Sequence, residues 1–292
     1  MSVLQVENLS RSYNGRRGVS GVSFCVNPGE IVGFIGPNGS GKTTTLRCIM
    51  DIIRRDTGDI LINGHSMPKE RIKALSHTAC WMDIGHLFYD LSAADHIDFI
   101  QKTRNVSKEV VKKYTKLFDI DSYLKLKVHK YSYGMKQRLG LSLAAMTESS
   151  LYLLDEPTNG LDPIGVTAFR EVLLMLAKEK NCAIFFSSHA LTELSKVADR
   201  ALFIKNGEIV HTEINKGGHV YHIKVESADH ALTLIPQIHA RAEDGYIIFD
   251  GTVAINAVLS ALYHHNVTVL DVEKKEADLE NIFHKLYEDQ NV

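Results

Sequence analysis

The chain of 292 residues lacks several features that mark common classes of protein. No apolar run approaches the roughly 18 to 20 residues of a membrane-spanning helix, so we expect that the chain cannot itself form a conduit across a bilayer. No two of its four cysteines form a C-x-x-C pair, which favours reduced thiols in a cytosolic protein over a disulfide framework or a zinc site. Residues 1–9 lack the pattern of a signal peptide, so we expect a protein that is not exported. The four cysteines are Cys25, Cys48, Cys80 and Cys182.

An excess of one charge is also missing. The sequence contains 33 Lys and Arg residues and 35 Asp and Glu residues, so its net charge predicts no general positive electrostatic field for nucleic-acid binding. Histidines do not gather into a metal site either. His219 and His222 lie three apart on an expected strand and so point to opposite faces, and no acidic or cysteine cluster lies near His264 and His265.

What the sequence does contain is a phosphate-binding loop. Residues 36–43 read Gly-Pro-Asn-Gly-Ser-Gly-Lys-Thr, which fits G-x-x-x-x-G-K-[ST] between an apolar strand-like run and a helix-like segment. The glycines let backbone N–H groups approach phosphate oxygens at a helix N-terminus. Lys42 can reach the β- and γ-phosphates, and Thr43 can offer its hydroxyl to Mg²⁺. The predicted phosphate-binding residues are Gly36, Pro37, Asn38, Gly39, Ser40, Gly41, Lys42, Thr43 and Thr44.

Two acids follow a second apolar run. Residues 151–154 read Leu-Tyr-Leu-Leu, as expected for a strand buried on both faces, and Asp155 and Glu156 come directly after it. We predict that Asp155 holds the Mg²⁺ shell and that Glu156 polarises the water that attacks the γ-phosphorus. The alternative is a solvated strand end, which the phosphate-binding loop disfavours. We expect no metal other than this Mg²⁺.

Residues 154–163, Leu-Asp-Glu-Pro-Thr-Asn-Gly-Leu-Asp-Pro, resemble the ATP-binding cassette (ABC) ATPases. The resemblance covers residues 1 to about 215 and implies an α/β fold, the P-loop NTPase core, with a helical subdomain at about 84–150. It also implies that the loop containing Asp162 faces a partner subunit. His189, which ends an apolar run at 183–188, matches the switch histidine of the family, which contacts the γ-phosphate and orients the water.

The family signature, usually Leu-Ser-Gly-Gly-Gln, is represented only in part. Ser132, Tyr133, Gly134 and Met135 occupy its place at an expected helix start. The resemblance implies that this turn binds the γ-phosphate of a nucleotide held by another subunit, through a hydroxyl and helix N-terminal N–H groups. Ser132 also suits an ordinary N-cap, and the two roles are compatible. Tyr133 replaces a glycine and would crowd the opposite nucleotide if its side chain points into the interface.

Two further candidates depend on family position. Asp83 lies where most members have Gln: it is predicted to reach Mg²⁺ through a water, and the alternatives are that it weakens closure as a third acid or is an ordinary loop acid. Tyr13 follows a strand-like run at 4–9, where the family stacks an aromatic ring on adenine. A surface-turn tyrosine is the alternative.

The helical subdomain touches the transmembrane subunit in this family. Apolar spacing predicts helices at 93–102, 108–118 and 134–146. A group of large apolar residues precedes them and either forms a groove for the membrane partner or packs into the core. The group consists of Leu87, Phe88, Tyr89 and Leu91.

The cassette pattern stops near residue 215, so we predict two domains, 1–215 and 216–292. Residues 216–292 read as a small α+β accessory domain, with strands predicted at 220–225, 245–249 and 267–272 and helices at 231–238, 254–264 and 279–287. It resembles the C-terminal extension of many bacterial exporter ATPases, which ends in a Leu-Glu-x-x-Phe element, here at 279–283. Its role stays open: it binds a regulator, pairs with its copy in the dimer, or covers the ATPase core.

The resemblance implies an ATPase subunit that uses ATP and Mg²⁺. Two copies would close over two ATP molecules, as a homodimer, and drive a separate membrane permease. Export of a drug, peptide or bacteriocin is expected over import. Such a subunit would be cytoplasmic and held at the inner face of the membrane through its permease. The alternative is a soluble or regulatory ATPase with weak hydrolysis that acts on a non-membrane partner.

Overall fold

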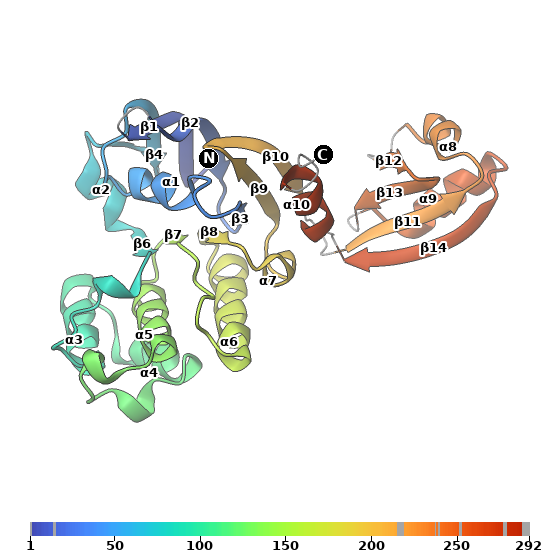
Figure 1. Cartoon of the computed structure of the whole chain (residues 1–292). Coiled ribbons are helices and arrows are strands. Elements are labelled where there is room, and N and C mark those ends of the chain that lie inside the picture. The colour runs from blue at the N-terminus through green and yellow to red at the C-terminus, as the bar shows by residue number, and fades with distance from the viewer. Residues whose placement is uncertain are drawn as a thin grey trace. The chain divides into compact units, whose positions relative to one another are not determined.

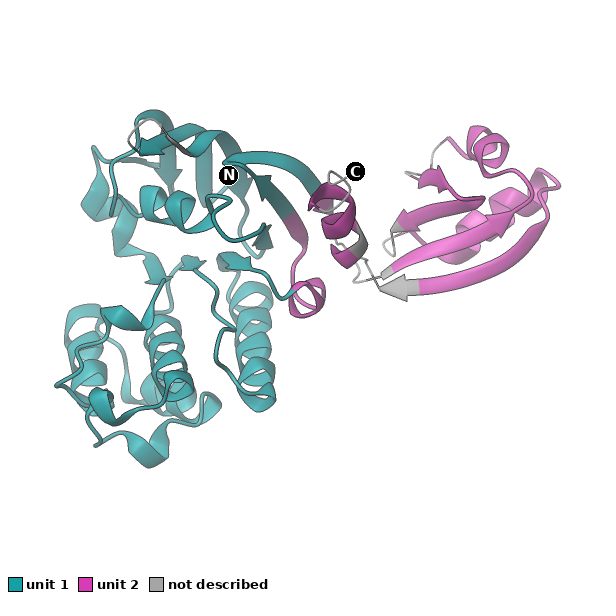
Figure 2. Cartoon of the chain, viewed as in Figure 1, with its two compact units in different colours: residues 1–190, 202–212 teal, residues 191–201, 213–292 magenta. Residues whose placement is uncertain are grey.

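The computed structural model describes residues 2–13, 16–214, 219–236, 238, 240–250, 253–276 and 279–287 (Figure 1). The chain separates into two compact units (Figure 2). Unit 1 comprises residues 1–190 and 202–212, and unit 2 comprises residues 191–201 and 213–292.

Unit 1 is built from two sheets and a group of helices. Its strands are β1 (Leu4–Tyr13), β2 (Arg16–Val26), β3 (Ile31–Ile35), β4 (Thr57–Ile62), β5 (His65–Met67), β6 (Thr78–Trp81), β7 (Leu151–Leu154) and β8 (Ala183–Ser188), together with most of β9 (Arg200–Lys205) and β10 (Glu208–Ile214). Its helices are α1 (Lys42–Ile49), α2 (Arg71–Ser76), α3 (Ala93–Arg104), α4 (Lys108–Leu117), α5 (Tyr133–Met146) and α6 (Pro163–Leu174), which continues as a π-helical turn, η4 (Met175–Glu179). Short 3₁₀ turns are η1 (Ile84–His86), η2 (Asp121–Tyr123) and η3 (Val128–Lys130).

The central sheet of unit 1 brings the predicted site segments to one edge. Its six strands run in the order β10-β9-β3-β8-β7-β6, and β3, β8, β7 and β6 pair in parallel. Every residue of β3, β7 and β8 is buried, which confirms the strands expected from the continuous apolar runs. Because parallel strands end at the same edge of a sheet, the segments after β3, β7 and β8 lie side by side there. The α/β fold predicted from the sequence is confirmed.

A second, antiparallel sheet packs on the first through aromatic side chains. Its strands run in the order β2-β1-β4-β5. Phe24 of β2 stacks on Phe185 of β8 with ring centroids 4.6 Å apart, and Phe34 of β3 lies 5.1 Å from Phe185. Since such pairs stabilise a core beyond their buried area, they hold β3 and β8 in place under the site.

The predicted helices between β6 and β7 are confirmed, and their starts are explained by serine caps. Ser92 accepts a hydrogen bond from Asp95 N–H, and the Asp95 carboxylate accepts one from Ser92 N–H, which makes a capping box at the start of α3. Ser107 caps α4 in the simpler manner, and Ser132 caps α5.

Helix α5 is seated on the central sheet through a glycine. A Cβ atom at Gly140 would lie 2.1 Å from Cη2 of Trp81, the last residue of β6. The indole ring therefore occupies the space that a larger residue would need. This contact joins α5 to the strand that precedes Asp83.

Unit 2 carries its own core. Its sheet runs in the order β12-β13-β11-β14 with antiparallel pairing. The unit contains α7 (Leu191–Ser195), β11 (His219–Val225), α8 (Ala228–Leu234), β12 (Ala240–Glu243), β13 (Tyr246–Asp250), α9 (Ile255–His264), β14 (Val269–Glu276) and α10 (Leu279–Tyr287). Within it, Thr192 of α7 donates a 2.6 Å hydrogen bond to Glu280 of α10, the helix of the Leu-Glu-x-x-Phe element.

Some sequence expectations need adjustment. Strand β12 was not predicted, α8 lies about three residues before its predicted position, and β14 starts two residues later than expected and extends to Glu276. Of the apolar group before α3, Leu87 is buried in the core, whereas Phe88, Tyr89 and Leu91 are exposed. Within the described ranges, no helix combines the length and the apolar character that spanning a bilayer requires.

Candidate active site

The loop between β3 and α1 has the geometry of a phosphate cradle. Gly39 has φ +82° and Gly41 has φ +114°, the left-handed region that glycine enters without strain. A Cβ at Gly36 would lie 2.5 Å from Ser40 Oγ and 2.5 Å from Ile204 O, so this position also requires glycine. The Ser40 hydroxyl is buried and makes no hydrogen bond in the structure. The backbone thus approaches closely where phosphate oxygens are expected.

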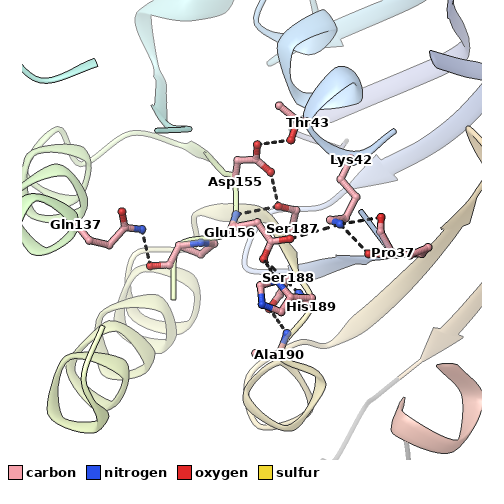
Figure 3. Close-up of polar contacts among 12 residues, drawn as sticks. Pro37, Lys42, Thr43, Gln137, Asp155, Glu156, Ser187, Ser188, His189 and Ala190 are labelled. Atoms are coloured by element: carbon pink, nitrogen blue, oxygen red, sulfur yellow. Dashed lines mark hydrogen bonds and ion pairs between the residues drawn. The ribbon is translucent and has the colours of Figure 1, made fainter. Parts of the chain in front are cut away.

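Lys42 lies across this loop. Its Nζ donates to Gly36 O at 2.7 Å and to Pro37 O at 3.3 Å, and it lies 3.4 Å from Glu156 Oε1 (Figure 3). The side chain exposes only 6% of its surface. A buried ammonium group held by loop carbonyls is placed to exchange them for phosphate oxygens.

Thr43 and Asp155 meet across the sheet edge. Thr43 Oγ1 donates to Asp155 Oδ2 at 2.6 Å, and Ser187 Oγ donates to Asp155 Oδ1 at 2.5 Å. Asp155 is 7% exposed. The hydroxyl and carboxylate oxygens brought together here are the hard ligands that Mg²⁺ prefers. Across the described residues, no group of three or more His, Cys, Asp and Glu side chains is arranged to hold a metal ion.

Glu156 is fixed from both ends. Its backbone has φ +46°, an uncommon conformation for a residue other than glycine, and its N–H donates to Ser187 Oγ at 2.9 Å. Its Oε2 atom accepts from His189 Nδ1 at 2.7 Å and from His189 N–H at 3.3 Å. Since an ionised carboxylate can only accept, Nδ1 of His189 carries a proton. The structure thus brings Lys42, Glu156 and His189 together.

Tyr13 lies close to the same loop. The tyrosine ends β1, is 42% exposed, and has the Arg11 guanidinium 5.0 Å from its ring centroid. A Cβ at Gly18 would lie 2.9 Å from Tyr13 Cε2, and one at Gly41 would lie 2.8 Å from Gly18 O. The backbone of Gly18 therefore lies between the tyrosine ring and the phosphate loop.

Asp83 has a local role in the structure. Its carboxylate accepts a 3.3 Å hydrogen bond from Gly85 N–H and caps η1. Among the described residues, no hydrogen bond joins Asp83 to Thr43 or Asp155. Asp83 lies two residues after the end of β6.

Comparisons with known proteins agree with this geometry. A family model described as "ABC transporter" matches residues 19–159. The chain is 32% identical over 289 residues to the uncharacterized ABC transporter ATP-binding protein YhcH of Bacillus subtilis (strain 168), covering 97% of this chain and 95% of that protein. This chain belongs to the family of ABC transporter ATP-binding proteins.

Two further similarities extend along the fold. The bacitracin transport ATP-binding protein BcrA of Bacillus licheniformis is 30% identical over 298 residues, which covers 98% of this chain and 97% of that protein. The dimeric post-hydrolysis structure of the ATP-binding cassette MJ0796 bound to ADP and Pi has a TM-score of 0.67 at 21% identity, covering 73% of this chain and 99% of that chain. The relatives thus make the chain an ABC ATPase, and the structural likeness shows that it has the fold of an ATP-binding cassette.

The predicted signature turn lies at the start of α5. Ser132 accepts a 3.2 Å hydrogen bond from Met135 N–H as the N-cap of the helix. Tyr133 is 49% exposed, and Gly134 follows it in the first turn. The predicted dimer-loop residue Asp162 caps α6 by accepting from Gly165 N–H at 3.0 Å. A hydrogen bond from Arg138, with that from Gly165 second, lowers the pKa of Asp162 below its usual range.

Two functional contacts were missed by sequence reasoning. Ser187 joins Asp155 to the backbone of Glu156, and Gln137 Nε2 of α5 donates to Pro157 O at 2.8 Å (Figure 3). Ser187 lies in a strand that was predicted, but only the parallel pairing of β7 with β8 shows that its hydroxyl faces both acids. Gln137 lies one turn into α5 within the stretch that resembles the family, but the resemblance alone does not show that its side chain reaches Pro157.

Proposed function

We propose that this ABC ATPase hydrolyses ATP through the cluster of Lys42, Asp155, Glu156 and His189 and drives a separate membrane permease in export. The observation that supports the proposal most directly is the Glu156 carboxylate, which is held between Lys42 at 3.4 Å and His189 at 2.7 Å, next to the Thr43 and Asp155 pair. Positioning and electrostatic stabilisation are what phosphoryl transfer needs most from a protein.

The residues have distinct roles in this proposal. When ATP binds, Lys42 exchanges Gly36 O and Glu156 for oxygens of the β- and γ-phosphates. Glu156 then accepts a proton from the attacking water as the water oxygen bonds to the γ-phosphorus and the bond to the bridging oxygen breaks. His189 keeps the Glu156 carboxylate oriented through Nδ1–H and contacts the γ-phosphate.

Thr43 and Asp155 would hold Mg²⁺, which neutralises charge on the transferred phosphoryl group when it is bound. The structure supports this assignment through the 2.6 Å contact between their oxygens. Asp83 would contribute only through a water, from its place after β6. Tyr13 would stack on adenine, consistent with its exposed ring beside Gly18 and the phosphate loop.

The site is completed by a second copy of the chain. We propose that the turn Ser132–Met135 of one copy meets the γ-phosphate on the other through the Ser132 hydroxyl and the backbone N–H groups at the start of α5, because a helix N-terminus attracts anions. An open cavity of about 390 Å³ lies at this turn, and Ser132, Gly134, Met135 and Asp162 are among its lining residues. MJ0796, with the same fold, is a dimer in its ADP and Pi complex.

The permease contact is proposed at the exposed apolar residues before α3. Phe88, Tyr89 and Leu91 expose large apolar surface in the helical part of unit 1, as expected for a protein contact. Through this contact the ATPase would sit at the inner face of the membrane. The relative BcrA is named for bacitracin transport, which supports export of a drug, peptide or bacteriocin. Because the relatives match along nearly their whole length, a transporter subunit is favoured over a soluble ATPase.

The composite site can be tested with Glu156→Gln. This variant should bind ATP, lose turnover and accumulate as a dimer with Mg-ATP, measured by size-exclusion chromatography with light scattering. Glu109→Gln, the same change on the exposed start of α4, is the matched control and should neither lose turnover nor trap a dimer. Wild-type turnover in Glu156→Gln would refute the role of Glu156, and a persistent ATP-bound monomer would refute the homodimer.

A further inference from the structure

The ring of Tyr133 rests on a glycine of the loop that follows Glu156. A Cβ atom at Gly160 would lie 2.1 Å from Tyr133 Cδ1, 2.4 Å from Cε1 and 3.3 Å from Cγ. The first two distances are shorter than real Cβ contacts, so the aromatic ring lies in the space that glycine leaves open. Gly160 also has φ +73°, where glycine is favoured. Tyr133 therefore points toward the loop of its own chain.

The approach of the two segments is close on both sides of this contact. A Cβ at Gly134 would lie 2.8 Å from Gly160 O, so the first turn of α5 touches the loop backbone as well. One turn further along α5, Gln137 binds Pro157 O at 2.8 Å, and Arg138 Nη2 binds Asp162 Oδ1 at 2.5 Å. Helix α5 thus contacts the loop at three places, near the start of the loop at Pro157, in its middle at Gly160 and at its end at Asp162.

The middle contact differs from the other two in kind. Gln137 and Arg138 hold the ends of the loop by hydrogen bonds, whereas Tyr133 and Gly160 meet only by shape. The loop begins at Glu156, whose own backbone is held by Ser187. A displacement at Gly160 would therefore be transmitted toward Glu156 on one side and toward Asp162 on the other.

We propose that Tyr133 is a positioning residue for hydrolysis: its ring seats on Gly160 and fixes the loop from Glu156 to Asp162. The inference rests on the proposed role of Glu156. A tyrosine at this signature position thereby acts within its own chain, and its orientation answers the concern that it crowds the opposite nucleotide. The ring carbons make the contact, so the hydroxyl is not required.

A double-mutant cycle tests whether the contact between the Tyr133 ring and Gly160 positions the loop. Gly160→Asn adds a Cβ while keeping a residue that tolerates positive φ, and Tyr133→Ala removes the ring. We expect kcat for ATP hydrolysis to fall about tenfold in Gly160→Asn and about threefold in Tyr133→Ala, with KM for ATP unchanged. In the double variant the added Cβ meets no ring, so kcat should stay at about the level of Tyr133→Ala.

Two controls separate this effect from general destabilisation. Gly64→Asn makes the same substitution at φ +77°, where a Cβ meets nothing within 4 Å, and should leave kcat unchanged. Tyr133→Phe keeps the ring and should retain wild-type kcat even if Gly160→Asn fails to fold. Thermal midpoints of all variants report whether any loss of rate follows loss of structure.

The outcomes are decisive in either direction. The inference is supported if Tyr133→Ala restores the kcat of Gly160→Asn, or if kcat falls in Tyr133→Ala but not in Tyr133→Phe. The inference is overturned if Gly160→Asn lowers kcat by the same factor in both backgrounds, or if Tyr133→Phe is as slow as Tyr133→Ala. Full turnover in Glu156→Gln would instead refute the proposed function, because the same assay measures that variant separately.

Discussion

The cluster around Glu156 and the signature turn of α5 lie in the same unit but are held in different ways. The cluster is a network of polar side chains in which Lys42 and Asp155 are almost fully buried and each polar contact has a named partner. The signature turn is half exposed at Tyr133, and its middle contact with the loop is a ring against a glycine.

This difference indicates which changes each region tolerates. A hydrogen-bonded cluster loses function when one polar atom is removed, because its partner is left buried and unsatisfied. A contact made by shape instead loses function when volume is added, and it recovers when volume is removed elsewhere. The first region should therefore respond to isosteric changes and the second to steric ones.

After Glu156→Gln, the largest effect is expected from His189→Ala. The substitution removes the 2.7 Å hydrogen bond to Glu156 Oε2, so the carboxylate loses its orientation toward the attacking water. We expect kcat to fall roughly hundredfold while ATP affinity is retained. Steady-state hydrolysis and fluorescent-nucleotide binding measure the two quantities.

The control for this prediction is His65→Ala. His65 Nδ1 pairs with Glu70 Oε1 at 3.4 Å, another histidine and glutamate pair of unit 1 but outside the cluster. If both variants hydrolyse ATP at the wild-type rate, the orienting role of His189 is wrong.

Ser187→Ala should have the next largest effect. Its hydroxyl donates to Asp155 and accepts from the Glu156 N–H, so the variant leaves a backbone donor unsatisfied beside the Glu156 carboxylate. We expect kcat to fall about tenfold and the free energy of unfolding to fall by about 1–3 kcal/mol. Ser142→Ala removes a buried hydroxyl that has no hydrogen bond, so it should lower neither quantity. Equal behaviour of the two serine variants would contradict the prediction.

Gly140→Ala tests a steric contact, the one between α5 and the ring of Trp81. The added methyl group would lie 2.1 Å from the Trp81 ring, so α5 or β6 must shift. Overpacking of this kind costs about 1–3 kcal/mol of unfolding free energy. Denaturant unfolding measures the loss, and Trp81, the single tryptophan, should change its emission in the folded state. Trp81→Phe in the same chain should relieve the cost, and an unrelieved cost would show that the ring is not the obstacle.

The hydrogen-bonded region could be predicted from the sequence to a larger extent than the steric one. Lys42, Asp155, Glu156 and His189 are residue types that the chemistry of a phosphate dictates, and each lies on a segment that follows an apolar run. Ser187 was missed because a serine in a buried strand has no distinctive pattern until β7 and β8 pair.

The steric contacts depend on tertiary structure that a pattern does not contain. Gly140 and Gly160 look like ordinary glycines until Trp81 and Tyr133 are placed against them. Leu87 shares an apolar pattern with its exposed neighbours and is buried only through packing. In unit 2, β12 reads Ala-Arg-Ala-Glu, which has little intrinsic strand preference, so its pairing with β13 defines it.

The smallest effect is expected at the end of the loop, where Asp162 combines charge with capping. Its pKa is lowered in the folded chain, first by the hydrogen bond from Arg138. A carboxyl group with a lowered folded pKa stabilises the fold above its unfolded pKa of about 3.9, and this stabilisation is lost as the pH falls through the folded pKa. Asp162→Asn keeps an N-cap residue but removes the charge. It should therefore be slightly less stable than the wild type at neutral pH and equally stable in acid, as denaturant unfolding between about pH 2.5 and 7 would show. A difference that persists unchanged into acid would mean that the carboxylate charge is not what Arg138 recognises, and that shape holds this end of the loop as it holds the middle.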